Sequence, residues 1–205
     1  MNKLDVLIYF LKNYKSILFK VLLYELFYSL KYLEFPFYYM KIYKNSKFAT
    51  DSIPCLYYYL HEIAKFINKR KIKKITDLGS GFGRVTNFLS NETKAKVIGI
   101  EFDKKVFNKA NIIKAKNVNL INKNFLKLNL KKHKSECFIM VDPLKYSKDT
   151  IKIQKKIINA NKQKKRPLYL IVINVDDKLI NKKFKKIKSK LQKNSKKRSI
   201  FFYYY

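Results

Sequence analysis

Three of the four glycines in this 205-residue chain lie within five positions, at Gly79, Gly81 and Gly83. Glycine is typical of places where a backbone turns tightly or lets a ligand approach closely. The β-branched and apolar residues 72–78 precede these glycines, and residues 85–89 have a helical pattern. The order predicts a strand, a glycine turn and a helix, which is where open α/β sheets bind ligands.

Asp77, just before the glycines, indicates which ligand the turn would accept. The dinucleotide fingerprint G-x-G-x-x-G needs a glycine at position 84, where this chain has Arg84. A carboxylate at Asp77 repels a pyrophosphate and attracts an ammonium group. The free N–H groups of a helix that begins after Gly83 would bind a carboxylate. An ammonium beside a carboxylate describes the amino-acid end of a ligand such as S-adenosylmethionine.

The stretch from Asp77 to Gly83 resembles motif I of the class I S-adenosylmethionine-dependent methyltransferases. The resemblance covers about residues 50–175 and implies S-adenosylmethionine as cofactor. It also implies cofactor contacts from the motif residues Asp77, Gly79, Ser80, Gly81 and Gly83. Glu101 ends the next predicted strand, 18 positions after Gly83, and resembles the motif II acid that binds the two ribose hydroxyls. Phe102, beside it, is a further candidate for cofactor contact, and Asp103 is expected to cap the helix predicted over 104–115.

Two further strand ends carry candidate residues. Asn124 and Phe125 follow the third predicted strand, where the family usually has an acid and then an aromatic residue. We expect Asn124 to bond the adenine amino group and Phe125 to flank the ring, with a plain turn as the alternative.

Asp142-Pro143-Leu144-Lys145-Tyr146, after the fourth strand, faintly resembles the Asp/Asn-Pro-Pro-Tyr/Phe motif of enzymes that methylate amino groups. Leu144 replaces the second proline and Lys145 is an extra residue, so a simple strand-end turn is an equal alternative. Asp142 and Tyr146 are the candidate catalytic residues: Asp142 would orient an acceptor amino group, and Tyr146 would stack on the acceptor or bond to it.

The predicted elements that would position these residues alternate between strand and helix. Strands are predicted over 72–78, 95–101, 118–122, 137–141, 167–175 and 199–205, and helices over 55–68, 85–89, 104–115, 148–161 and 177–192. This order favours one α/β domain over residues 49–205: a doubly wound, mostly parallel twisted sheet of about six strands with helices on both faces. Only one strand follows the last predicted helix, so the seventh strand usual in the family is expected to be missing.

Residues 1–48 read as an apolar and basic helical extension before this domain. Its lysines fall on about half of the helical circumference, and it lacks the uncharged run of about 18 residues that spans a bilayer. Three interpretations stay open: a helical lid, a partner-binding helix, or a peripheral membrane contact through residues 1–45. Ser52 is a candidate N-cap of the helix that follows, and Thr50, Asp51 and Ser52 are candidates to touch the ligand.

The formal net charge is +33, from 47 Lys and Arg against 14 Asp and Glu. This balance favours RNA, a ribosomal component or an anionic membrane surface as partner, with nucleotide bias of the genome and solubility as the alternative. Cys55 and Cys137 are far apart, and the sequence has no Cys/His metal spacing, so we expect reduced core cysteines, no metal and a cytoplasmic location.

Three functions are consistent with these residues. The first is methylation of an amino-type acceptor in RNA or a ribosomal component, and the second is lysine methylation of a protein at a membrane. The third is a non-catalytic nucleic-acid-binding protein, against which the intact Asp77 and Glu101 argue. Methyl transfer from a sulfonium depends mainly on alignment of the two reactants, so a recognisable set of catalytic residues is not required.

Overall fold

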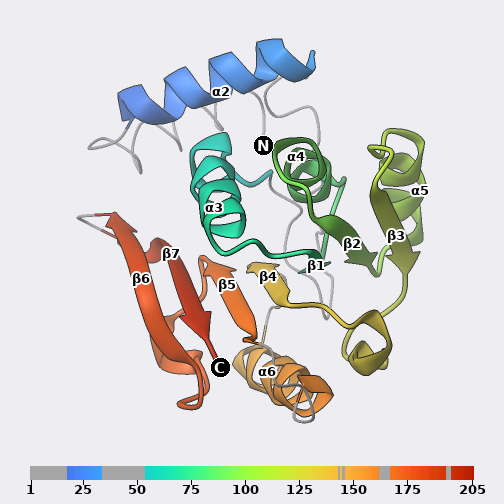
Figure 1. Cartoon of the computed structure of the whole chain (residues 1–205), viewed down its shortest axis with the longest axis vertical. Coiled ribbons are helices and arrows are strands. Elements are labelled where there is room, and N and C mark those ends of the chain that lie inside the picture. The colour runs from blue at the N-terminus through green and yellow to red at the C-terminus, as the bar shows by residue number, and fades with distance from the viewer. Residues whose placement is uncertain (1–17, 34–53, 143, 145, 162–166, 193–194) are drawn as a thin grey trace.

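The computed structural model describes residues 18–33, 54–142, 144, 146–161, 167–192 and 195–205. Its strands form one seven-stranded sheet in the order β3-β2-β1-β4-β5-β7-β6 (Figure 1). The strands are β1 (Lys74–Leu78), β2 (Lys96–Glu101), β3 (Val118–Asn122), β4 (Cys137–Val141), β5 (Tyr169–Ile173), β6 (Lys185–Gln192) and β7 (Ser195–Tyr204). The first five run parallel, and β7 pairs antiparallel with both β5 and β6.

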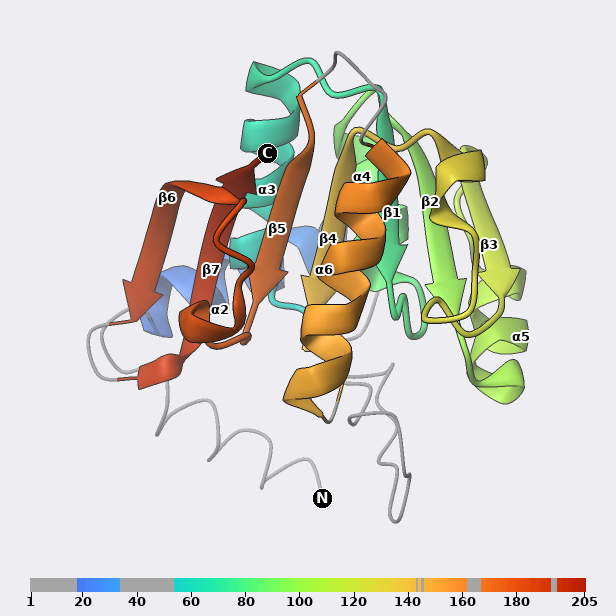
Figure 2. The same ribbon diagram turned by 90° about the horizontal axis from the view of Figure 1, so that it is seen from below.

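Helices cover both faces of this sheet, which confirms the doubly wound α/β class. One face carries α3 (Tyr57–Lys69), α4 (Arg84–Glu92) and α5 (Lys104–Ile112), and α2 (Leu18–Tyr32) lies outside α3 and α4 (Figure 1). The other face carries α6 (Ser147–Asn161) and the short 3-10 helices η1 (Leu130–His133) and η2 (Asp177–Leu179) (Figure 2). Because strand side chains alternate, Ile75 joins the core under α3 and α4, whereas Leu78 joins the core under α6.

The strand order reverses direction between β1 and β4, at the middle of the parallel strands. The chain leaves β1 toward β2 and β3 on one side, and later forms β4 and β5 on the other. Leu78 lies opposite Ile100 of β2 and Met140 of β4. The carboxyl ends of β1 and β4 are therefore the topological switch point, where open α/β sheets bind their ligands.

The predicted helix over 177–192 is wrong. The chain forms only η2 there and then β6, which pairs with β7, so the sheet has seven strands and the hairpin expected to be missing is present. Lysines of this segment lie on the strand, with Lys186 Nζ 4.9 Å from the ring centroid of Phe201 and Lys188 Nζ 4.4 Å from that of Phe202. Their ammonium groups lie over the aromatic rings, and pairing with an aromatic strand outweighs helix propensity.

The described part of the N-terminal extension is α2, which confirms a helix there. Residues 1–17 and 34–53 lie outside the described residues, and with them the expected boundary at 48/49 and the candidates Thr50, Asp51 and Ser52. Helix α3 begins at Tyr57, later than predicted, and Glu25 of α2 accepts a 2.7 Å hydrogen bond from the Tyr57 N–H.

Cys55 and Cys137 are free and buried, as expected. Within the described ranges, every helix is too short or too polar to cross a bilayer.

Candidate cofactor site

The glycine turn is attached to β2 through its own backbone. The N–H groups of Gly79 and Ser80 both donate to the carbonyl of Ile100, over 2.9 and 3.1 Å. Gly83 has φ +89° and is the last residue before α4, a left-handed conformation that a side chain would disfavour. The turn therefore presents backbone to the carboxyl edge of the sheet, as the sequence predicts.

Gly99, the fourth glycine, gives this turn its room. A Cβ atom at Gly99 would lie 2.6 Å from Leu120 Cδ2 and 2.9 Å from Ser80 Cβ. The turn thus packs directly on bare strand backbone, and Ser80 occupies the space that a side chain on β2 would fill. All four glycines of the chain serve the same bend.

Asp77 lies beneath the bend and is 1% exposed. Neither of its carboxylate oxygens has a hydrogen-bond partner among the described residues, and the same holds for the buried Ser80 Oγ. Burial, and secondly the nearby Glu101 carboxylate, raise the pKa of Asp77 to about 8. A buried carboxylate without a partner is unfavourable. The ammonium group of an amino acid would donate hydrogen bonds to it and would balance its negative charge.

Glu101 closes the site on the β2 side. Its Oε2 accepts a 2.9 Å hydrogen bond from the Gly81 N–H, and its Oε1 accepts one of 2.8 Å from the Asp103 N–H. Each oxygen keeps a lone pair, so two neighbouring hydroxyl groups could still donate to it. Burial raises the pKa of Glu101. Phe102 follows with its side chain 55% exposed, and Asp103 caps α5 through the Val106 N–H, as predicted.

Asn124 and Phe125 follow β3 on the same edge. Asn124 Oδ1 accepts a 2.9 Å hydrogen bond from the Leu126 N–H, which is the plain turn that the sequence left open. Phe125 is only 6% exposed and belongs to the core under α6, with Leu78 and Ile100. Its ring is mostly buried in this core, and its contact with an adenine ring stays a prediction.

Asp142 and Tyr146 lie across the switch point from the glycine turn. Asp142 has φ +40° and donates its N–H to the Ile173 carbonyl over 3.1 Å. Tyr146 is 42% exposed, and its carbonyl accepts from the N–H groups of Asp149 and Thr150 at the start of α6. Pro143 and Lys145 between them lie outside the described residues.

The sequence did not single out Asn174, which joins Asp142 at this edge. Asn174 directly follows β5 and has φ +60°, and its Oδ1 is shielded from solvent without a partner among the described residues. Two adjacent strands therefore end in left-handed residues other than glycine, a strained arrangement that tends to occur at functional sites. The sequence signal that could have identified Asn174 is its place directly after the five apolar residues Tyr169–Ile173.

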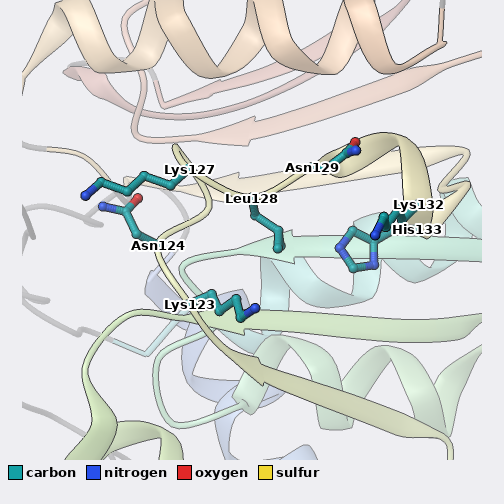
Figure 3. A pocket seen from close by; sticks show the side chains of 7 residues that line it. All are labelled: Lys123, Asn124, Lys127, Leu128, Asn129, Lys132 and His133. Atoms are coloured by element: carbon teal, nitrogen blue, oxygen red, sulfur yellow. The ribbon is translucent and has the colours of Figure 1, made fainter.

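A basic pocket includes Asn124, one of the candidates for cofactor contact (Figure 3). Its volume is about 560 Å³, and it is lined by Lys123, Asn124, Lys127, Leu128, Asn129, Lys132 and His133. These residues come from η1 and the segment between β3 and η1, and none is acidic. Burial lowers the pKa of His133. Residues 104–135 contain ten lysines and no Asp or Glu. This local excess of lysine is visible in the sequence, but above we considered only the net charge of the whole chain.

Arg84, the residue that breaks the dinucleotide fingerprint, has a structural role. Its guanidinium donates to Glu25 Oε2 of α2 over 2.6 Å and to the Cys55 carbonyl over 3.1 Å, and its Cζ lies 3.8 Å from the ring centroid of Tyr57. Both members of the ion pair are buried. Helix α2 is thus joined directly to the residue that follows the glycine turn.

Comparison with solved structures supports the fold. An RNA methyltransferase from Salinibacter ruber in complex with S-adenosyl-L-homocysteine has a TM-score of 0.54 and 12% identity, covering 74% of this chain and 93% of that chain. A SAM-dependent methyltransferase from Leishmania major has a TM-score of 0.56 and 15% identity, covering 71% and 70%. A mutant of MtNAS has a TM-score of 0.55 and 12% identity; the match covers 72% of this chain and 59% of that chain.

No match was found among curated protein sequences. The description of the family that does match, over residues 57–196, is "Ribosomal RNA adenine dimethylase". That range includes the glycine turn, Glu101, the basic pocket and the strand ends at Asp142 and Asn174. The chain therefore belongs to the ribosomal RNA adenine dimethylase family, and it is an S-adenosylmethionine-dependent methyltransferase of class I.

Proposed function

We propose that this methyltransferase acts on an amino group of a base in RNA, with ribosomal RNA as the substrate class. The observation that carries the proposal is the acid-free segment 104–135, which forms a lysine-lined pocket that includes Asn124, a candidate for cofactor contact. Clustered lysines without acids suit a phosphate backbone. The family description, which names an adenine acceptor in ribosomal RNA, supports the same substrate.

The cofactor would be held by the two acids and the backbone between them. Asp77 would accept the ammonium group, and the N–H groups at the start of α4 would bind the carboxylate. Glu101 would accept from the ribose hydroxyls, with Phe102 beside the adenine ring and Asn124 at its edge. Gly79, Ser80, Gly81 and Gly83 would line the methionine portion.

The chain's part in the reaction is alignment. S-adenosylmethionine, when bound, supplies an electrophilic methyl group on a sulfonium. Asp142 would accept a hydrogen bond from the acceptor amino group and so orient its nitrogen, and the exposed ring of Tyr146 would stack on the base. Asn174, whose Oδ1 has no partner among the described residues, is placed to accept a second hydrogen bond. Positioning of this kind contributes several kcal/mol to catalysis, roughly 7 or more in favourable cases.

A transfer assay tests the acceptor. The full chain is incubated with labelled S-adenosylmethionine and, separately, with total RNA, ribosomal subunits and membrane protein. We expect label in RNA, at the amino group of a base. Label in a membrane polypeptide would instead identify a protein lysine methyltransferase. Cofactor binding without label in any fraction would identify a non-catalytic binding protein.

The basic pocket has its own test. Replacing Lys123, Lys127 and Lys132 by Gln should reduce the slope of log affinity for single-stranded RNA against log salt by about 2, since each phosphate contact contributes roughly 0.7. The matched control replaces Lys65, Lys69 and Lys71, exposed lysines on and after α3, by Gln. Equal changes in the two triple variants would mean that only net charge matters and would remove the pocket from the RNA path.

A further inference from the structure

The outward face of α2 carries exposed apolar side chains that belong to neither the proposed cofactor site nor the proposed RNA site. Seven of the fourteen exposed large apolar side chains among the described residues lie on α2 or directly after it, and each is 47–90% exposed. They are Phe19, Leu22, Leu23, Leu26, Phe27, Leu30 and Leu33. At 100° per residue they span an arc of roughly 140°, which is a continuous stripe along the helix. Exposed apolar surface this contiguous marks an interaction site.

The inner face of α2 holds the stripe in place. Glu25 pairs with Arg84 at the start of α4, and Lys31 pairs with Glu92 at its end over 2.6 Å. Tyr28 adds a 2.8 Å hydrogen bond to His61 of α3. These contacts fix the rotation of α2 about its axis and leave the stripe exposed. Figure 1 shows α2 on the outer side of α3 and α4, away from the sheet.

Charge selects the partner. The only acid on α2, Glu25, is buried in its ion pair with Arg84, and the exposed Lys20 borders the stripe on the same side as Lys31, whose ammonium is paired with Glu92. Two copies of a chain with net charge +33 repel each other, which disfavours a dimer through this face. An apolar stripe bordered by lysines is the pattern of a helix that lies in the interface of an anionic membrane.

We propose that α2 docks this enzyme on an anionic lipid surface, lying in the plane of the interface with its apolar stripe among the acyl chains. The described helix has 15 residues, fewer than the roughly 20 needed to cross a bilayer, so the contact proposed for α2 is peripheral. The inference is independent of the acceptor, because none of the stripe residues belongs to the proposed cofactor or RNA site.

A tryptophan reporter tests the contact directly, since the chain contains no Trp. Phe27→Trp places one on the stripe, and Ile112→Trp places a matched control at an exposed position on α5. With vesicles containing phosphatidylglycerol, we expect a blue shift and quenching by brominated acyl chains for Phe27→Trp only. Vesicles of phosphatidylcholine alone should bind much more weakly. No shift for Phe27→Trp, or equal shifts for both variants, would overturn the proposal.

A triple variant distinguishes a lipid contact from two other ways of covering the stripe: another part of this chain, or a second copy of it. Replacing Leu22, Leu26 and Leu30 by Gln should lower vesicle partitioning about a hundredfold, because three apolar side chains no longer enter the lipid, with the urea midpoint and S-adenosylmethionine affinity unchanged. A lower urea midpoint would mean that another part of this chain covers the stripe. A wild-type mass of two chains that falls to one in the variant would mean a dimer. Either result, or unchanged partitioning, contradicts a lipid contact.

Discussion

Replacing Asp77 by Asn should raise the free energy of unfolding of the cofactor-free protein and lower its affinity for S-adenosylmethionine. The Asp77 carboxyl is buried without a partner among the described residues, and its pKa rises from 3.8 to about 8 on folding. The unfolded chain therefore releases this proton near pH 4, whereas the folded protein keeps it until about pH 8. Between these values the unfolded state binds fewer protons, so this group lowers stability progressively as the pH rises.

The magnitude follows from the two pKa values. At pH 7 the folded protein holds a proton that a carboxyl with its ordinary pKa of 3.8 would have lost, a difference of about 3 pH units. At about 1.4 kcal/mol per unit, this lowers the free energy of unfolding by about 4 kcal/mol. Asparagine has nearly the same shape and no proton to hold. The gain from Asp77→Asn should thus grow from near zero at pH 4 to about 4 kcal/mol at pH 7.

Urea unfolding of both proteins from pH 4 to pH 8, without cofactor, measures this difference, and all other titrating groups cancel in the comparison. Titration with S-adenosylmethionine completes the test, because the variant no longer offers a negative charge to the ammonium. We expect about a hundredfold weaker binding, or about 3 kcal/mol, as for a truncated buried charge pair. A stability difference that does not change with pH would refute the raised pKa, and unchanged cofactor affinity would refute the role of Asp77.

Three other changes test the surrounding structure. Glu101→Gln should weaken S-adenosylmethionine binding by about 1–3 kcal/mol, measured by calorimetry, and an effect near zero would remove its ribose contact. Gly99→Ala should cost about 1–3 kcal/mol of stability in thermal or urea unfolding, because its Cβ would lie 2.6 Å from the side chain of Leu120; a neutral change would show that the bend can move. Glu25→Gln should cost about 3–5 kcal/mol by leaving Arg84 buried and unpaired, and Glu25→Gln/Arg84→Met should recover part of that loss.

The sequence predicted the centre of the fold well because its signals there are local. Apolar β-branched runs marked β1, β3 and β4 correctly, and β3 and β4 to the residue. The glycine turn was also a local signal, since its residues are adjacent in the chain. Asp103 was recognised as a helix cap because capping depends on a side chain and an N–H group only three positions away.

The errors arose where long-range contacts decide. A helix was predicted over 177–192, but residues 185–192 form β6 because they pair with the aromatic strand β7, a contact that the local sequence does not show. The packing of Phe125 in the core under α6 was not expected, because the sequence does not show which side of the sheet a residue after a strand will face. Arg84 was treated only as a missing glycine, since its partner Glu25 lies 59 positions away.

The most direct measurement compares two ligands on the unaltered protein: S-adenosylhomocysteine and methylthioadenosine, which lacks the amino-acid end. If Asp77 and the bend beside it select that end, methylthioadenosine should bind at least about a hundredfold more weakly, as expected for the loss of a buried charge pair, and the difference should shrink in Asp77→Asn. Equal affinity of the two ligands for the unaltered protein would contradict the account.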